Sequence, residues 1–525
     1  MKLYRAFATV GGLTLASRVL GFLRDIAFAW GFGAGMVADA FAVAFRFPNL
    51  FRRLFGEGAF NSAFIPLFAK ELEGNGRDAA RTFAEEALAG LAAVLVALMI
   101  VAIIAMPWLM YLLAPGFSAT PEKFDLAVLM TQITFPYLLC MSLVALFSGV
   151  LNTFGKFVES SAVSIVLNGT LLGGIVVSYW LGYLDSPEGG IVQAIAVFVA
   201  GVLQLWLLID GLRRNNFSLK LRRPRMTPGM RRLITLGIPG VIAGGVTQLN
   251  IMIGTIIASI QPGAVSQLFY ADRLYELPLA IVGIAVGVVL LPDVARQLRA
   301  GNEAGAVESQ NRALEFAMLL TVPAAVALAV VPGEIVQVLF ERGAFTASDT
   351  ANTSAVLAVF ALGLPAFVLI KVLSPAYFAR EDTKTPMRYA VISLTANTLG
   401  SIALFFLFRR LGWLPHLGIA VATAVGGWLN AALLWVTLIK RGHFALDRPM
   451  LRTLAKIVLA NAVMGISLFV TAEVLADWFG RERSFLMHMG GLASLIGTGF
   501  AVYALAVLAT GALRIGQLRK ALRRG

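Results

Sequence analysis

Long apolar runs, separated by short polar or charged segments, recur along the whole chain. A helix that crosses a bilayer needs about 20 mostly apolar residues, and fourteen such stretches can be traced. Their centres lie near Ala16, Arg46, Val96, Leu139, Leu171, Gly201, Ile251, Ala285, Ala325, Pro365, Ile402, Leu429, Ile466 and Phe500. The alternation with a period of two that is typical of membrane β-barrel strands does not occur. The pattern therefore predicts an all-α polytopic membrane protein with fourteen transmembrane helices.

Composition supports this prediction and excludes a water-soluble domain. Of the 525 residues, 58% are hydrophobic and 14% are charged, and the mean hydropathy is +0.81. Soluble domains have about 25% charged residues. The first apolar run lacks the short core and small-residue cleavage site of a signal peptide, so no removable leader is expected. The single cysteine, Cys140, lies in an apolar run and is expected to be a small core residue rather than a disulfide partner.

The net charge of +14 is distributed unevenly between the connections of the predicted helices. Cations gather after the sixth and twelfth helices and in the tail: Arg213, Arg214, Lys220, Arg222, Arg223, Arg225, Arg231, Arg232, Lys440, Arg441, Arg448, Arg452, Lys456, Arg514, Arg519, Lys520, Arg523 and Arg524. Alternate connections such as 185–190 and 261–263 have none, and Arg409, Arg410, Arg481 and Arg483 are mild exceptions. This asymmetry predicts cytoplasmic termini. We interpret the basic excess as topology plus contact with anionic lipid, not as nucleic-acid binding.

The chain also contains a weak internal repeat. Pro66 faces Pro292 at an offset of 226 residues, and later matches in the same order have an offset near 229, among them Pro136 with Pro365. Leu167–Gly173 faces Ala396–Gly400 in the same series. Because the offset spans an even number of helices, the copies have the same orientation, a layout common in secondary transporters.

The repeat predicts a domain organisation. Residues 1–212 form an N-lobe of helices 1–6, residues 233–441 form a C-lobe of helices 7–12, and a central cavity is expected between the lobes. Residues 213–232 form a basic cytoplasmic linker whose composition is typical of a flexible connection. Residues 442–525 add helices 13 and 14 and a basic tail.

Signatures of catalysis are missing from the sequence. Gly155-Lys156 lacks the remainder of a phosphate-binding loop, and His416, His443 and His488 lack metal-ligand spacing. No nucleophile elbow or zinc-protease motif occurs. We therefore expect a transporter rather than an enzyme, with no cofactor, and leave the coupling ion open. An intramembrane lipid phosphatase would need a nucleophile constellation that is not visible.

Charges inside the first two apolar runs are the strongest functional signal. Each costs a few kcal/mol at membrane depth, and the group comprises Arg18, Arg24, Asp25, Asp39, Arg46, Arg52, Arg53 and Glu57. Ser17, Gly21 and Arg24 lie at helical spacings and so share one face. In the second half, Asp272, Arg273 and Glu276 begin the eighth helix, and Lys371 lies in the tenth.

The excess of arginine in this group predicts an anion site, because guanidinium groups bind phosphate oxygens in pairs. The acids are interpreted as partners that hold the arginines while the site is empty. Ion-pair struts between helices and snorkelling side chains are the structural alternatives. A pure scaffold role would leave these charges unexplained.

Four motifs carry a family resemblance that covers essentially the whole chain. They are A-S-R-V-L-G-F-L-R-D (16–25), A-D-A-F-x-V-A-F-R-x-P-N-x-F-R-R-L-F-x-E-G-A-F (38–60), Y-A-D-R-L-Y-E-L-P (270–278) and R-E-D-T-K-T-P (380–386). The chain resembles the MurJ (MviN) family of bacterial lipid II flippases, within the multidrug, oligosaccharidyl-lipid and polysaccharide exporter superfamily. The resemblance implies two six-helix lobes around a central cavity and two extra helices beside a lipid-accessible groove.

The resemblance also implies site residues. The family's cavity arginines match Arg18, Arg24, Arg52 and Arg273, and its essential acidic residue matches Asp39. The supporting positions are Ser17, Asp25, Arg53, Glu57, Asp272 and Glu276. The sodium-ligand pattern of some members is not evident, and Asp382 is a weak metal candidate.

The implied function is export of lipid II across the bacterial cytoplasmic membrane by alternating access, with the arginines holding its diphosphate. The implied partners are lipid II, membrane lipids and the cell-wall synthesis machinery. Two alternatives stay open: a flippase for another undecaprenyl-diphosphate-linked saccharide, and a drug or cation exporter, which should line its cavity with carboxylates.

Overall fold

The computed structural model describes residues 2–52, 60–445 and 447–512. Helices and the connections between them make up these residues, and no strand occurs among them. Each of the fourteen predicted helix centres falls inside a helix. Ten helical segments of the described chain are long and apolar enough to cross a membrane. The all-α membrane architecture is therefore confirmed, and the count of fourteen stays a prediction.

Contacts divide the chain into two compact units. Unit 1 comprises Met1–Ser266 and Arg342–Thr346, and unit 2 comprises Gln267–Glu341 and Ala347–Gly525. This division is by packing and differs from the predicted division by repeat, because the seventh helix packs within unit 1. The lobe boundaries drawn from the repeat stay a prediction.

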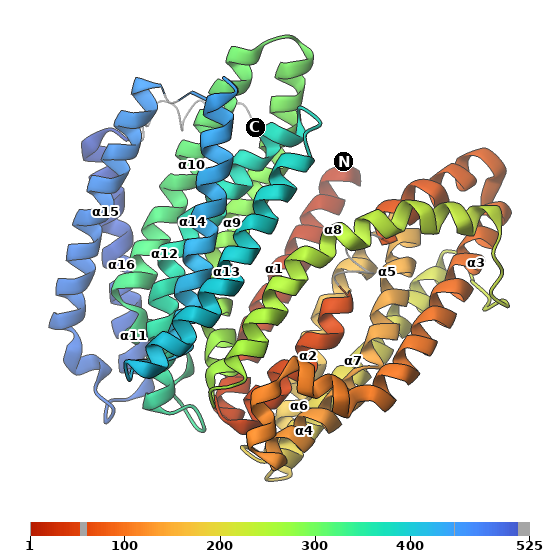
Figure 1. Cartoon of the computed structure of the whole chain (residues 1–525), viewed down its shortest axis with the longest axis horizontal. Coiled ribbons are helices and arrows are strands. Elements are labelled where there is room, and N and C mark those ends of the chain that lie inside the picture. The colour runs from red at the N-terminus through yellow and green to blue at the C-terminus, as the bar shows by residue number, and fades with distance from the viewer. Residues whose placement is uncertain (1, 53–59, 446, 513–525) are drawn as a thin grey trace. The chain divides into compact units, whose positions relative to one another are not determined.

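Unit 1 contains eight α-helices and one short 3-10 helix among the described residues, and Figure 1 labels the α-helices. They are α1 (Lys2–Phe32), α2 (Met36–Arg52), α3 (Phe60–Leu113), η2 (Pro115–Ala119), α4 (Pro121–Thr134), α5 (Tyr137–Thr153), α6 (Val158–Trp180), α7 (Pro187–Arg214) and α8 (Pro228–Ala258). The helix α1 packs on α6, and α2 packs on α4. The helix α8 runs beside α3 (Figure 1).

Local sequence signals set several boundaries in unit 1. The helices α7 and α8 begin at a proline whose preceding residue, Ser186 or Thr227, caps the first turn with its hydroxyl. The long helix α3 changes direction at Gly76, where φ is 83° and ψ is −179°. This backbone conformation is open chiefly to glycine. The break at Gly76 separates the end of the second predicted span from the third.

A second glycine ends α1. Gly33 has a φ of +59°, and a Cβ added there would lie 2.4 Å from the carbonyl oxygen of Ala344. The amide of Ala344 in turn donates to the carbonyl oxygen of Trp30 at 3.0 Å. Residues 342–346 therefore pack against the end of α1, which explains why they belong to unit 1.

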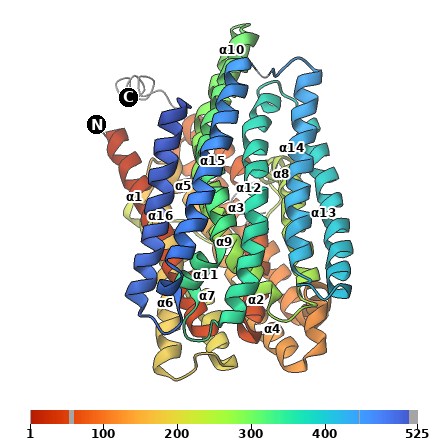
Figure 2. The same ribbon diagram turned by 90° about the vertical axis from the view of Figure 1, so that its left-hand side faces the viewer.

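Unit 2 contains the remaining helices, with the first turn of α9 shared with unit 1. They are α9 (Ala264–Arg299), α10 (Glu303–Val330), α11 (Pro332–Phe340), α12 (Ala347–Phe378), α13 (Lys384–Arg410), α14 (Leu417–Lys440), α15 (Arg448–Val474), η3 (Ala476–Phe479) and α16 (Phe485–Thr510). An apolar core joins α9, α10, α12, α14 and α15. The helices α15 and α16 lie side by side in Figures 1 and 2, and α15 packs on α10.

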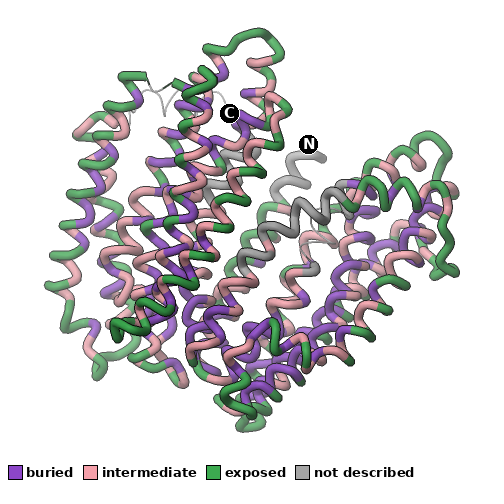
Figure 3. Tube along the Cα trace, viewed as in Figure 1, coloured by how far each residue is buried: buried purple, intermediate pink, exposed green. Residues whose placement is uncertain are grey.

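Burial is uneven among these helices, as the colours of Figure 3 show. Within unit 2, α12 and α14 are the most buried spans, while α13, α15 and α16 expose most of their apolar residues. Exposed leucine, isoleucine and phenylalanine side chains along whole helices suit hydrocarbon rather than water. Cys140 is buried, as predicted.

The connection between α7 and α8 differs from the flexible linker that composition suggests. Residues 215–227, which we call the connecting strap, have no helix but are bonded to α3 at several points. The buried carboxylate of Glu85 accepts from the amide of Lys220 at 3.0 Å and pairs with Arg222 at 2.5 Å. The hydroxyl of Thr227 donates to Glu86 at 2.7 Å. The strap is therefore a docked element of unit 1.

Candidate functional site

The predicted polar face of α1 meets α6 at one residue, Asn168. Arg24 donates from Nε at 3.1 Å and Nη2 at 2.5 Å to Asp25, and from Nη1 at 2.9 Å to Asn168. The Asn168 amide nitrogen donates to the carbonyl oxygen of Ser17 at 3.0 Å. A Cβ added at Gly21 would lie 3.1 Å from the same amide, so a glycine there lets the two helices approach.

These contacts orient a nearly buried guanidinium. The side chains of Arg24 and Asp25 are 12% and 8% exposed, which leaves both charges largely out of water. Two nitrogens of Arg24 face Asp25 and the third faces Asn168, so the rotamer of Arg24 is fixed from two helices. The predicted pairing of an acid with an arginine is thus present, between neighbours on α1.

Asp39 on α2 lies in a different constellation, which sequence reasoning missed. Its carboxylate is fully buried and accepts from the ammonium of Lys123 on α4 at 2.5 Å. It also accepts from the amides of Gly263 and Ser266 and from the Ser266 hydroxyl, each at 2.8 Å. Its described partners are therefore a lysine and the turn that begins α9, rather than a predicted arginine.

Lys123 completes this second constellation. Its ammonium lies 4.2 Å from the centre of the Phe117 ring, a cation–π arrangement. Removing either charge would leave the other buried without its ion-pair partner, which is strongly destabilising. The pair therefore ties α2, α4 and residues 263–266 together within unit 1.

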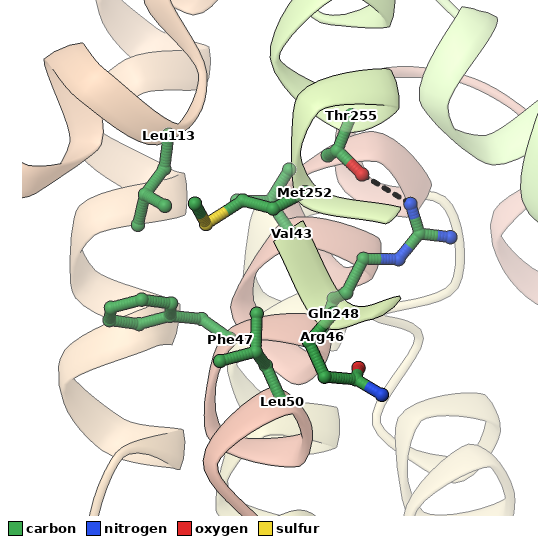
Figure 4. Close-up of a pocket in the computed structure, with 8 residues that line it drawn as sticks. All are labelled: Val43, Arg46, Phe47, Leu50, Leu113, Gln248, Met252 and Thr255. Atoms are coloured by element: carbon green, nitrogen blue, oxygen red, sulfur yellow. Dashed lines mark hydrogen bonds between the residues drawn. The ribbon is translucent and has the colours of Figure 1, made fainter. Parts of the chain in front are cut away.

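Arg46 lies at the edge of a pocket between α2, α3 and α8 (Figure 4). Its Nη1 donates to the hydroxyl of Thr255 on α8. The pocket has an empty volume of about 370 Å³, part of it open to solvent, and is mostly apolar. It is lined by Val43, Arg46, Phe47, Leu50, Leu113, Gln248, Met252 and Thr255.

The remaining predicted residues of the first half are not brought together by the described structure. Arg18 is exposed on α1. Arg52 ends α2, and its side chain lies outside the description, while Arg53 and Glu57 lie outside the described residues altogether. The predicted four-arginine cluster therefore stays a prediction.

In unit 2, Arg273 pairs with Glu276 at 3.4 Å and lies 4.9 Å from the centre of the Phe269 ring. Asp272, one position before Arg273, is partly buried on the same helix. Lys371 on α12 is exposed. These groups remain candidates for the second part of the predicted site.

Asp382, the weak metal candidate, is hydrogen-bonded to the first turn of α13 and to Arg441. It accepts from the amide and hydroxyl of Thr385 at 2.9 Å and 2.6 Å and from Arg441 at 2.7 Å. The Thr385 hydroxyl and then Arg441 lower the pKa of this carboxyl from 3.8 to about 2. Among the described residues, no group of three His, Cys, Asp or Glu could hold a metal ion.

Two functional candidates, Lys123 and Asn168, had only a weak signal in the sequence. Each is a polar residue in or beside an apolar run, which marks it as costly at membrane depth. Their partners, Asp39 and Arg24, lie 84 and 144 residues away. Helical spacing within one segment does not predict contacts between residues so far apart in the sequence.

Comparisons of the chain with known proteins agree on one family. Residues 28–488 match the family model "Lipid II flippase MurJ". A probable lipid II flippase MurJ of Rhizobium tropici is 46% identical over 525 residues, covering 100% of this chain and 97% of the relative. A lipid II flippase MurJ of Burkholderia cenocepacia is 34% identical, covering 96% of each chain.

Solved structures agree. A lipid II flippase MurJ in an inward closed conformation matches with a TM-score of 0.76 and 26% identity, over 95% of this chain and 97% of that one. An inward-facing multidrug MATE transporter of the MOP superfamily matches with a TM-score of 0.66 and 14% identity, over 81% and 94%. The latter likeness shows the fold alone. The chain is therefore a multi-pass membrane protein that belongs to the lipid II flippase MurJ family, a family of transporters and not of enzymes.

Proposed function

We propose that this chain moves lipid II from the inner to the outer leaflet of the bacterial cytoplasmic membrane by alternating access, with both termini in the cytoplasm. The full-length match to the family supports the substrate. The observation that carries the proposal is the guanidinium of Arg24, fixed by Asp25 and Asn168 inside a predicted span.

The chemistry of the substrate suits this arrangement. The diphosphate of lipid II cannot enter hydrocarbon without compensation for its charge. A guanidinium can donate two parallel hydrogen bonds to phosphate oxygens. Asp25 balances Arg24 while the site is empty, and an incoming diphosphate competes with Asp25 for the same nitrogens. Arg18, Arg52 and Arg273 would complete the grip.

Asp39 has a separate role in this proposal. Its contacts with Lys123 and with residues 263–266 hold the start of α9 against α2 and α4. Transporters alternate access by rocking or gating one helix bundle against another, and contacts between packed elements change in such transitions. Asp39 and Lys123 are therefore positioning residues for the conformational cycle and do not bind the substrate.

The membrane potential can supply the driving force. Moving one charge through 100 mV is worth about 2.3 kcal/mol. An inside-negative potential therefore favours outward passage of a diphosphate of charge near −2 by roughly 4–5 kcal/mol. This arithmetic requires no nucleotide, and a sequence without a phosphate-binding loop agrees with it.

The test replaces Arg24 in cells whose own flippase is depleted and measures the lipid II that becomes accessible outside. We expect Arg24→Ala to abolish export and Arg24→Lys to restore it only in part, because an ammonium lacks the paired donors. Arg312→Ala, which removes an exposed cation paired with Glu308, is the matched control.

Normal export by an inserted Arg24→Ala protein would overturn the site. Export that is equal for lipid II and for an undecaprenyl-diphosphate carrying another saccharide would favour the broader flippase. Unchanged export in a depolarised membrane would overturn the potential as the energy source while leaving the site intact.

A further inference from the structure

The connecting strap, residues 215–227, has a buried side that fixes its backbone. Phe217 is fully buried, and its ring centre lies 5.9 Å from that of Phe68 and 5.0 Å from that of Phe154. Arg81 of α3 lies 5.3 Å from the Phe217 ring and donates to the carbonyl oxygen of Asn216 at 3.3 Å. The position of the strap on unit 1 is therefore set by packing.

The opposite side of the strap combines exposed apolar and cationic side chains. Leu221 is 72% exposed and Met226 is 67% exposed, in a segment without helical structure. Between and beside them lie exposed cations: Lys220, Arg222, Arg223 and Arg225 on the strap, with Arg213, Arg214, Arg231 and Arg232 at the flanking helix ends.

Few acids compensate this charge. Glu85 pairs with Arg222, and Asp210 pairs with Arg214 at 2.7 Å. Among the described residues, no ion pair is formed by Arg223 or Arg225 with an acid of the chain. Two apolar side chains displayed beside uncompensated arginines are the arrangement that interfacial anchors use, with the apolar groups in the acyl boundary and the cations at headgroup phosphates.

The neighbouring helices set the depth of this surface. The candidate span of α7 ends at Arg214, directly before the strap, and α8 begins at Pro228, directly after it. A segment that directly follows the cationic end of a span lies where the helix leaves the hydrocarbon. The strap therefore presents its cations at the level of the lipid headgroups.

We propose that the connecting strap is a docking surface for anionic phospholipid, which binds headgroup phosphates through Arg223 and Arg225 and inserts Leu221 and Met226 into the acyl boundary. Charge complementarity selects this occupant, and the surface does not depend on the transport site. Its function is to hold the middle of α3, around Glu85, and the start of α8 at the membrane surface.

The experiment uses the full chain in nanodiscs of fixed zwitterionic and anionic lipid content, with only one of the two lipids brominated at a time. A Cys140→Ala, Met226→Cys protein carries a bimane label on the strap. We expect brominated anionic lipid to quench the label at least about two-fold more than brominated zwitterionic lipid, with this preference lost at about 1 M salt.

The matched variants separate local charge from total charge. Arg223→Gln with Arg225→Gln should bring the quenching ratio close to one, whereas Arg409→Gln with Arg410→Gln, an exposed pair at the end of α13, should leave it unchanged. Arg223→Lys with Arg225→Lys should keep the preference and shows that the strap remains folded.

Three results would overturn the proposal. They are a ratio near one in the starting protein, a preference that survives loss of Arg223 and Arg225, or a label that neither lipid quenches. Displacement of the label from anionic lipid by a single-stranded oligonucleotide at physiological salt would assign the surface to nucleic acid instead.

Discussion

The two compact units differ in their most buried ion pairs, although unit 1 also contains exposed pairs such as Arg81–Asp78. In unit 1, Lys123–Asp39 and Arg24–Asp25 have side chains that are at most 12% exposed. In unit 2, Arg441–Asp382 has side chains that are 42% and 23% exposed, and Arg312–Glu308 is more exposed still. Burying a charge costs free energy. The buried pairs of unit 1 are therefore the charges for which a structural or functional role is most strongly indicated.

A pair of asparagines related by the predicted repeat makes the difference concrete. Asn168 and Asn397 are 229 residues apart and both are buried. Asn168 accepts from Arg24, whereas Asn397 accepts from the hydroxyl of Ser401 at 3.1 Å. The two copies therefore share an amide at one position of the fold, and in unit 1 this amide orients a cation.

The largest expected effect comes from removing one charge of the Lys123–Asp39 ion pair. Asp39→Asn or Lys123→Met alone should lower the free energy of unfolding by about 3–5 kcal/mol, because each leaves a buried charge without its partner. The double variant should be more stable than the sum of the two losses predicts. Thermal unfolding in detergent measures the stability, and lipid II export measures the cycle.

Asp78→Asn is the control, since Asp78 pairs with Arg81 but its side chain is 97% exposed. That variant should change the stability little. If Asp39→Asn proved as mild as Asp78→Asn, the contrast between buried and exposed pairs would fail. Additive losses in the double variant would mean that the two side chains do not act as a pair.

The asparagines give the next effect and test the comparison directly. Loss of a hydrogen bond to a charged group costs about 1.5–3 kcal/mol, so Asn168→Ala should leave Arg24 poorly oriented and lower export roughly ten-fold. Asn397→Ala should lower the unfolding temperature by no more than Asn168→Ala does, and it should leave export near its starting level. Export and unfolding are measured on the same preparations. Equal loss of export in both variants would erase the functional difference between the units.

The sequence was sufficient to predict the helices, because apolar run length placed each helix centre. It predicted that acids hold the arginines, but it did not single out Asp25 as the partner of Arg24. The partners of Asp39 could not be predicted, because they come from α4 and from the turn before α9, and helical periodicity carries no information on how helices pack. The docking of the connecting strap on unit 1 could not be predicted for the same reason. Its composition resembles a flexible linker, while the burial of Phe217 between Phe68 and Phe154 depends on tertiary contacts.

The smallest effect concerns Asp382 of unit 2, whose side chain is 23% exposed in its pair with Arg441. The Thr385 hydroxyl and Arg441 lower its pKa from 3.8 to about 2 in the folded protein. A lowered folded-state pKa stabilises the fold above the unfolded value, and this contribution disappears as the pH falls from about 4 towards 2. Asp382→Asn should therefore lower the unfolding temperature slightly at pH 7 and make no difference near pH 2. A variant whose deficit persisted unchanged at pH 2 would show that Asp382 acts by packing and not by charge, and the exposed pairs of unit 2 would then need a different explanation from the buried pairs of unit 1.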